Sequence, residues 1–269
     1  MLKVQCGAKL LFNRAEKCNY FAWLACLISS FSIFIPISFS TYVVYGIPFL
    51  ADILYFILNF ISQKNVRDAS HMRKYFDSYV LDINVEQFSN SESMIIKEKA
   101  ETLYFKNKRF AKVQMNNTGA DIPPGVRNWY EFSELCSGNN AIFECQKSNI
   151  WWTKKILHYN ILFLLLLIII EVIGVIGVIM LSPSYYLLLC FPGIIIQTFE
   201  RLYFNSKYYR VSLEIDGARS TVESSPDRNG IENLQDLIER RREINVIGIN
   251  CIHKHCASKL TSLYNTIRK

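Results

Sequence analysis

Short motifs typical of enzymes are missing from this sequence. It contains no phosphate-binding loop of the form G-x-x-x-x-G-K-[ST], no H-E-x-x-H zinc motif and no G-x-S-x-G nucleophile motif. Each of these motifs positions a phosphate, a metal or a nucleophile for catalysis. We therefore expect no enzymatic activity, no catalytic residue and no cofactor.

The eight cysteines also lack the spacing of a structural metal site. The densest group of possible ligands is Cys251, His253, His255 and Cys256. Structural zinc sites usually take two separated pairs of ligands, because ligands packed this closely cannot easily complete one tetrahedron. We interpret this group as an ordinary surface and expect no metal site.

Charged residues are scarce in four apolar stretches, although they make up 20% of the chain. The stretches are residues 20–37, 45–61, 161–181 and 185–199. A helix needs roughly 20 mostly apolar residues to cross a bilayer core about 30 Å thick. The sequence therefore predicts four transmembrane helices. The fourth stretch is short, and its place directly after the third is what favours a span.

The linkers inside the two pairs, residues 38–44 and 182–184, contain no charged residue. The other flanks are basic, with Lys3, Lys9, Arg14, Lys17, Lys64, Arg67, Arg73, Lys74, Lys154, Lys155, Arg201, Lys207 and Arg210. Lysine and arginine concentrate on the cytoplasmic side of membrane proteins. We expect two hairpins with both termini and the segment between the hairpins in the cytoplasm. The net charge of +7 partly reflects this topology.

The segment between the hairpins is too long to be a simple loop. Apolar residues recur in it at helical spacing, and residues 93–113 predict one helix. Residues 140–159 predict a helix that runs straight into the third span and couples this segment to the membrane. The fold class we predict is a mainly α integral membrane protein with four parts. These are a first hairpin with its N-terminal segment (1–61), a helical cytosolic domain (62–159), a second hairpin (160–199) and a cytosolic C-terminal domain (200–269).

Glu171 lies in the middle of the third apolar stretch. A carboxylate inside a membrane is costly and by default marks a functional-site hypothesis. Gly174 and Gly177 permit close approach of a neighbouring helix, and Asp52 is the candidate counterpart of Glu171 in the second span. Two interpretations stay open, a pore-lining carboxylate and a polar group satisfied inside the bundle. Both place these residues in the bundle interior.

Two aromatic and basic patches lie in the central segment. The first contains Arg127, Trp129 and Tyr130, and the second contains Gln146, Lys147, Asn149 and Trp152. Basic side chains neutralise phosphates while aromatic rings stack on bases, so both patches are candidate ligand-binding sites for a nucleotide. The alternatives are a domain core for the first patch and an interfacial aromatic belt for the end of the second.

At these residues the chain resembles the SMODS-associating four-transmembrane effectors of bacterial cyclic-oligonucleotide anti-phage systems. The resemblance rests on the order of hairpins and cytosolic segments, on R-N-W-Y at residues 127–130 and on C-Q-K-S-N-I-W-W at residues 145–152. It implies a homo-oligomeric receptor of the bacterial inner membrane. Such a receptor binds a cyclic di- or trinucleotide, not a DNA or RNA polymer, and then breaches the lipid bilayer.

Two other functions stay open from the residues alone. One is a constitutive ion channel or transporter centred on Glu171. The other is a membrane scaffold whose cytosolic domain recruits a protein.

Overall fold

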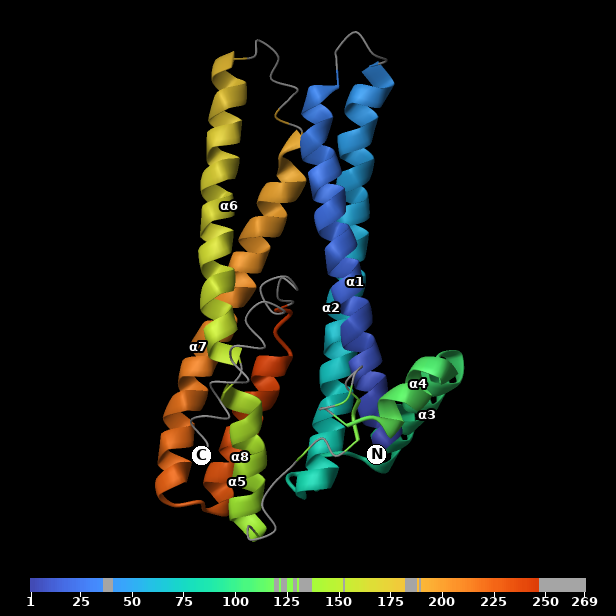
Figure 1. The fold of residues 1–269 in the computed structure, drawn as a ribbon, viewed down its shortest axis with the longest axis vertical. Coiled ribbons are helices and arrows are strands. Elements are labelled where there is room, and N and C mark those ends of the chain that lie inside the picture. Colours follow the sequence, from blue (N-terminus) through green and yellow to red (C-terminus); the bar gives the residue numbers. More distant parts are fainter. Residues whose placement is uncertain are drawn as a thin grey trace. The chain divides into compact units, whose positions relative to one another are not determined.

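The structure is a computed structural model of the chain. It describes residues 1–35, 41–118, 121, 125–127, 130, 137–151, 153–181, 188 and 190–246. These residues are mostly helical and form no strand, apart from an isolated bridge between Thr118 and Arg127. The mainly α fold class is thereby confirmed. The helices (Figure 1) are α1 (Leu2–Phe31), α2 (Thr41–Leu81), α3 (Asn90–Lys106), α4 (Lys108–Asn116), α5 (Gly138–Trp151), α6 (Thr153–Leu181), α7 (Pro192–Ser224) and α8 (Arg228–Arg242).

Local side-chain contacts set several helix ends. Ser89 caps α3 in a capping box, where its hydroxyl accepts the backbone N–H of Glu92 at 3.2 Å. Asp227 caps α8 by accepting the Gly230 N–H at 3.0 Å. At Asn107 the side chain donates to the Leu103 carbonyl at 2.9 Å, which competes with the helical backbone pattern. The helical stretch predicted over residues 93–113 is confirmed except at Asn107, where α3 gives way to α4.

In the C-terminal segment, α7 ends at Ser224 and α8 begins at Arg228. The predicted continuity from residues 140–159 into the third span depends on Trp152, which lies outside the described residues. That continuity stays a prediction.

The chain forms two compact units that interleave in sequence. We call residues 1–14, 64–151 and 210–245 the charged unit, and residues 15–63, 152–209 and 246–269 the apolar unit. The helices α1, α2 and α7 each contribute residues to both units. The four consecutive parts predicted from the sequence remain a prediction.

The charged unit has a core built by α1, α2 and α3. Ala8 of α1, Met72 of α2 and Ala100 of α3 are at most 2% exposed and belong to one apolar cluster. On the other side of this unit, α5 packs on α8, where Gln146 lies against Ile231. Apolar faces of helices far apart in sequence thus bring the N-terminal, central and C-terminal segments together.

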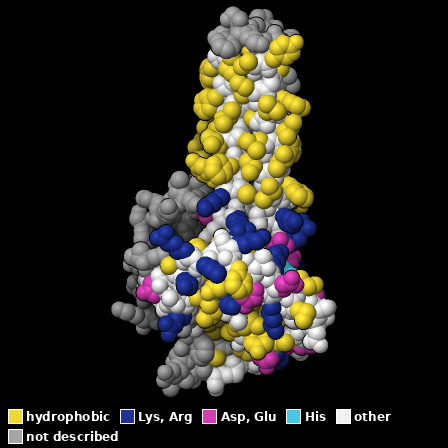
Figure 2. Space-filling model, turned by 90° about the vertical axis from the view of Figure 1, so that its right-hand side faces the viewer, with side chains coloured by type: hydrophobic (Ala, Val, Ile, Leu, Met, Phe, Trp, Pro, Cys, Tyr) yellow, Lys and Arg dark blue, Asp and Glu magenta, His cyan; other side chains and the backbone are white. Residues whose placement is uncertain are grey.

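In the apolar unit, apolar side chains lie on the surface and polar side chains lie in the interior, which is the reverse of a water-soluble protein. Large apolar side chains are exposed along α1, α2 and α6, among them Phe49 at 66%, Phe60 at 71% and Ile173 at 64%. Figure 2 shows one face of this apolar surface. The buried side chains include Asn59 and Glu171, each 6% exposed. Lipid favours such a surface, whereas polar groups in a membrane turn toward the bundle interior.

Among the described residues, three helices are long and apolar enough to cross a membrane, namely Leu2–Phe34, Tyr42–Leu81 and Asn160–Met180. They overlap the first three predicted spans. The fourth, residues 185–199, falls partly outside the described residues, and its described part lies at the start of α7. The chain is thus a membrane protein by length, composition and side-chain distribution.

Candidate functional site

Helix α7 carries a polar face into the interior of the apolar unit. Gly193, Gln197, Arg201 and Asn205 are spaced four residues apart, so they lie on one side of the helix. Gln197, Arg201 and Asn205 are at most 3% exposed. A buried stripe of this composition is unusual for a membrane helix and marks α7 as the polar centre of the bundle.

Helix α2 meets this face with three hydrogen-bond donors. Tyr55 Oη, Asn59 Nδ2 and Gln63 Nε2 donate to the carboxylate of Glu200 at 3.0, 2.5 and 2.8 Å. The oxygen of the same Asn59 amide accepts from Arg201 Nη2 at 2.9 Å. Asn59 therefore connects the Glu200 carboxylate to the Arg201 guanidinium. Charge-assisted bonds of this kind are about twice as strong as neutral ones.

The same helix reaches α1 and α6 through neighbouring residues. Gln197 Nε2 donates to Asn19 Oδ1 of α1 at 3.3 Å. Thr198 Oγ1 donates to Glu171 Oε1 of α6 at 2.6 Å. The predicted carboxylate Glu171 thus lies buried in the bundle with a polar partner on α7. The second carboxylate oxygen, Oε2, has no hydrogen-bond partner.

The other residues singled out with Glu171 differ in their surroundings. Asp52 lies against α7, because a Cβ atom added at Gly193 would be 2.2 Å from its Oδ1. A Cβ at Gly174 would lie 3.4 Å from the ring of Phe191, so this glycine faces the segment that leads into α7. At Gly177 a Cβ would meet no atom within 4 Å. Among the described residues, Gly174 thus has a side-chain neighbour and Gly177 has none, and close helix approach at either glycine stays a prediction.

The first predicted ligand patch belongs to the charged unit. Arg127 is exposed, and its backbone N–H donates to the Asn117 carbonyl at 3.0 Å. Tyr130 is partly buried, and its hydroxyl donates to Asp77 Oδ1 at 2.7 Å. Burial and then the charge of Asp77 raise the pKa of the Tyr130 hydroxyl, which keeps it protonated as a donor. Trp129 lies outside the described residues.

Asp77 joins this patch to the C-terminal helix. Its side chain is fully buried, and its second oxygen pairs with Arg242 at the end of α8. The backbone carbonyl of Arg242 in turn accepts from Ser70 Oγ of α2 at 2.6 Å. This cluster of Ser70, Asp77, Tyr130 and Arg242, which we call the Asp77 cluster, ties α2 to α8 and to the segment around Tyr130.

The second predicted patch lies on α5 and makes contacts of its own. Gln146 is fully buried and donates to the Ile231 carbonyl at 3.0 Å and to Gln235 Oε1 at 3.2 Å. Lys147 pairs with Glu144 at 2.9 Å and with Glu223 at 3.4 Å. The side chains of Asn149 and Trp152 are outside the described residues, as are Cys251, His253, His255 and Cys256.

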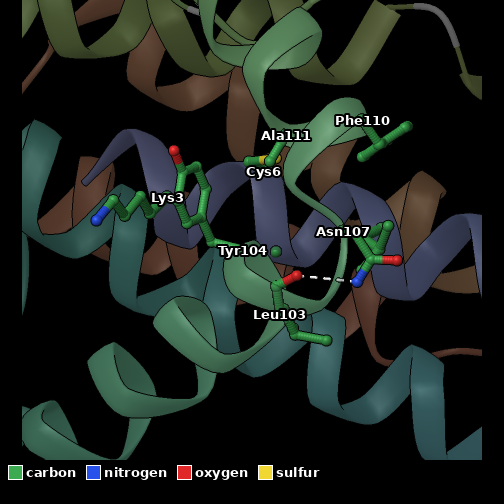
Figure 3. Close-up of a pocket in the computed structure, with 9 residues that line it drawn as sticks. Lys3, Cys6, Leu103, Tyr104, Asn107, Phe110 and Ala111 are labelled. Atoms are coloured by element: carbon green, nitrogen blue, oxygen red, sulfur yellow. Dashed lines mark hydrogen bonds between the residues drawn. The ribbon is translucent and has the colours of Figure 1, made fainter.

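Sequence reasoning missed a cleft on the charged unit. It measures about 550 Å³ and is lined by Met1, Leu2, Lys3, Val4, Lys97, Ala100, Glu101 and Met115. A smaller hollow with a volume of about 10 Å³, room for roughly one water, is also lined by Lys3 and lies between α1, α3 and α4 (Figure 3). There the Lys3 Nζ lies 4.8 Å from the centre of the Tyr104 ring. The lining residues come from segments about 100 positions apart in sequence. No local sequence motif therefore predicts the cleft.

The polar contacts of Glu200 and Arg201 were also missed. The sequence analysis treated Arg201 as a basic flank of the fourth span, yet its side chain is buried at 2% exposure. Tyr55, Asn59 and Gln63 at four-residue spacing were the available signal, because this spacing places three polar groups on one face of a membrane helix.

Comparison with known proteins gives one assignment. Residues 4–192 match the SMODS-associating 4TM effector domain, which is well over half of the chain. Comparisons with curated proteins and with solved structures gave no match. Because the match runs from α1 through α6 and reaches the start of α7, it covers three of the helices that meet in the polar interior. The chain belongs to the SMODS-associating 4TM effector family.

Proposed function

We propose that this protein is an anti-phage membrane effector that permeabilises the bacterial inner membrane when its charged unit binds a cyclic di- or trinucleotide. The observation that carries the proposal is the membrane bundle with a polar interior in a member of this effector family. In this account the charged unit and both termini are cytoplasmic and the active form is a homo-oligomer. No catalytic step, metal, cofactor or nucleic-acid polymer is part of it.

Two surfaces of the charged unit suit an anionic ligand. One is the exposed Arg127 beside Tyr130 in the first predicted patch. The other is the cleft with Lys3 and Lys97, whose volume of about 550 Å³ falls in the range of roughly 300–1,000 Å³ usual for ligand pockets. Lys3 pairs with Glu101 of the same lining at 2.6 Å, which leaves Lys97 as the candidate phosphate contact. The cleft is the stronger candidate, because it combines this lysine with an apolar wall.

A ligand shifts a protein toward an active state only through a higher affinity for that state. The Asp77 cluster offers a suitable switch, since it links α2, α8 and the segment around Tyr130 within the charged unit. Helix α2 is continuous from Thr41 to Leu81 and carries residues of the membrane bundle as well. We propose that ligand binding loosens this cluster and that α2 transmits the change.

The test of the proposed function is potassium efflux from liposomes that contain the purified full-length protein. We expect efflux after addition of at least one member of a panel of cyclic di- and trinucleotides, and none with linear nucleotides. Equal efflux with and without every cyclic nucleotide would instead support a constitutive channel. Absence of efflux together with absence of nucleotide binding would contradict the proposal.

Reversing the charge of Lys97 should weaken cyclic-nucleotide binding by about tenfold, because a cationic contact to phosphate is replaced by repulsion. The matched control is Lys112→Glu, which changes an exposed lysine of α4 outside the lining of the cleft. Isothermal titration of the full-length protein in detergent measures both variants. Equal affinities for Lys97→Glu and the control would move the site away from the cleft.

A further inference from the structure

We infer that the polar face of α7 lines a cation pathway through the membrane bundle and that the Arg201 side chain closes this pathway in the state described here. The inference deepens the proposed function by naming the ions and the closing residue, and it rests on that function for the opening stimulus. It concerns residues of the apolar unit alone.

The polar contacts along α7 follow one another in a row parallel to the helix axis, which we call the file. Asp52 lies against Gly193, Asn19 is bonded to Gln197, and Asn59 is bonded to Arg201. At a rise of about 1.5 Å per residue, the stripe from Gly193 to Asn205 extends for about 18 Å along the helix. That length is more than half of a hydrocarbon core about 30 Å thick.

Further polar groups extend the file beyond the start of α7. Ser29 Oγ of α1 donates to the Cys190 carbonyl at 3.4 Å, and Ser32 Oγ lies 3.3 Å from Cys190 Sγ. These three residues are at most 4% exposed. The file therefore continues past Gly193 into the segment that precedes α7.

Among the described residues of the apolar unit, five buried oxygens accept no hydrogen bond. They are Asp52 Oδ1, Asn160 Oδ1, Glu171 Oε2, Gln197 Oε1 and Asn205 Oδ1. For the three amides, rotation of the side chain by half a turn would place the NH₂ group where the unbonded oxygen lies. The two carboxylates have no such alternative, because they offer only acceptors when ionised. Buried acceptors without donors are costly, and in a membrane bundle only water or a cation can supply what they lack.

The negatively charged side chains along the file favour cations over anions. Asp52, Glu171 and Glu200 are three carboxylates, and Glu200 alone has its donors on α2. Rings and rows of carboxylates and carbonyl oxygens are the usual lining of cation channels. An anion such as chloride would meet the same oxygens without donors, so the pathway should favour potassium and sodium over chloride.

Arg201 is the feature that closes the file. It lies on the stripe between Gln197 and Asn205, is 2% exposed and donates to Asn59 Oδ1 at 2.9 Å. A fixed guanidinium in a narrow polar pathway repels cations. Opening therefore requires that the Arg201 side chain leave the stripe, for example by rotation of α7 against α2.

The experiment compares ion fluxes of full-length variants in liposomes without any nucleotide. Arg201→Gln should raise potassium flux at least tenfold over the wild type, and the reversal potential should report selectivity for potassium over chloride. Arg201→Lys keeps the charge and should leak less than Arg201→Gln. Lys207→Gln removes an exposed cation of the same helix and is the matched control.

Adding Asp52→Asn and Glu171→Gln to Arg201→Gln should lower the ratio of potassium to chloride permeability several-fold. If Arg201→Gln does not yield folded protein, the milder Asn59→Ala, which removes one acceptor of the guanidinium and keeps its charge, should give a smaller leak of the same selectivity. Absence of a leak in both folded variants, or a leak that passes chloride as readily as potassium, would overturn the inference.

The two proposals fail in different ways. A cation-selective leak in Arg201→Gln, with a wild type that never responds to cyclic nucleotides, would support the pathway and contradict the proposed activation. A wild type that responds to a cyclic nucleotide but then passes potassium and chloride equally would support the proposed activation and contradict the cation pathway.

Discussion

Replacing Asp77 by alanine should destabilise the charged unit more than any other single truncation in it. The substitution leaves the Arg242 guanidinium and the Tyr130 hydroxyl without their shared acceptor, in a place where Asp77 itself is fully buried. Removing one partner of a buried ion pair costs about 3–5 kcal/mol. The melting temperature of the full-length protein in detergent should therefore fall by roughly 6–12 °C.

The control for this prediction is Asp68→Ala on the same helix. Asp68 pairs with Lys99 at 2.7 Å, but the two side chains are 31% and 38% exposed. Exposed pairs of this kind contribute only about 0–1 kcal/mol. If both variants melt at the same temperature, the Asp77 cluster is not a structural link between α2 and α8.

Replacing Glu200 by alanine is the second change with a large expected effect. It removes the acceptor of Tyr55, Asn59 and Gln63 at once, and it removes the carboxylate of the residue that precedes Arg201. We expect a loss of about 3 kcal/mol in stability and a raised basal potassium leak, because Asn59 is then free to release the guanidinium. Thermal melting and flux from liposomes measure the two effects.

Two further variants make the Glu200 result specific. Glu200→Gln keeps an acceptor and should fall between the wild type and the alanine variant. Glu214→Ala removes a carboxylate of the same helix whose partner is Arg240 and whose side chain is 44% exposed, and it should change neither melting nor leak measurably. If Glu200→Ala has the same melting temperature and the same leak as Glu214→Ala, the hydrogen bonds between α2 and α7 do not keep the pathway closed.

Run length and charge made the membrane helices readable from the sequence. Residues 161–180 lie in the most apolar of the three candidate spans, and residues 20–34 and 45–61 lie in long apolar helices as expected. The break between α7 and α8 also follows from local sequence, because Pro226 cannot continue a helix without cost. These features depend on local composition alone.

The site depended on contacts that local composition does not encode. Glu171 stood out because it interrupts an apolar run, whereas Glu200 and Arg201 lie where a span gives way to a charged tail and so looked like ordinary flanking residues. Their burial follows from the packing of α7 against Asn59 of α2, about 140 positions earlier. The packing of Gln146, a candidate ligand contact, against α8 likewise depends on residues about 85 positions later.

The most direct measurement of the central claim is the membrane potential of bacterial cells that express this protein together with a cyclic-oligonucleotide synthase. A voltage-sensitive dye should report depolarisation only when both proteins are present, and Arg201→Gln should depolarise the cells without the synthase. A stable potential in cells that contain both the membrane-inserted protein and measured amounts of cyclic di- and trinucleotides would contradict the account.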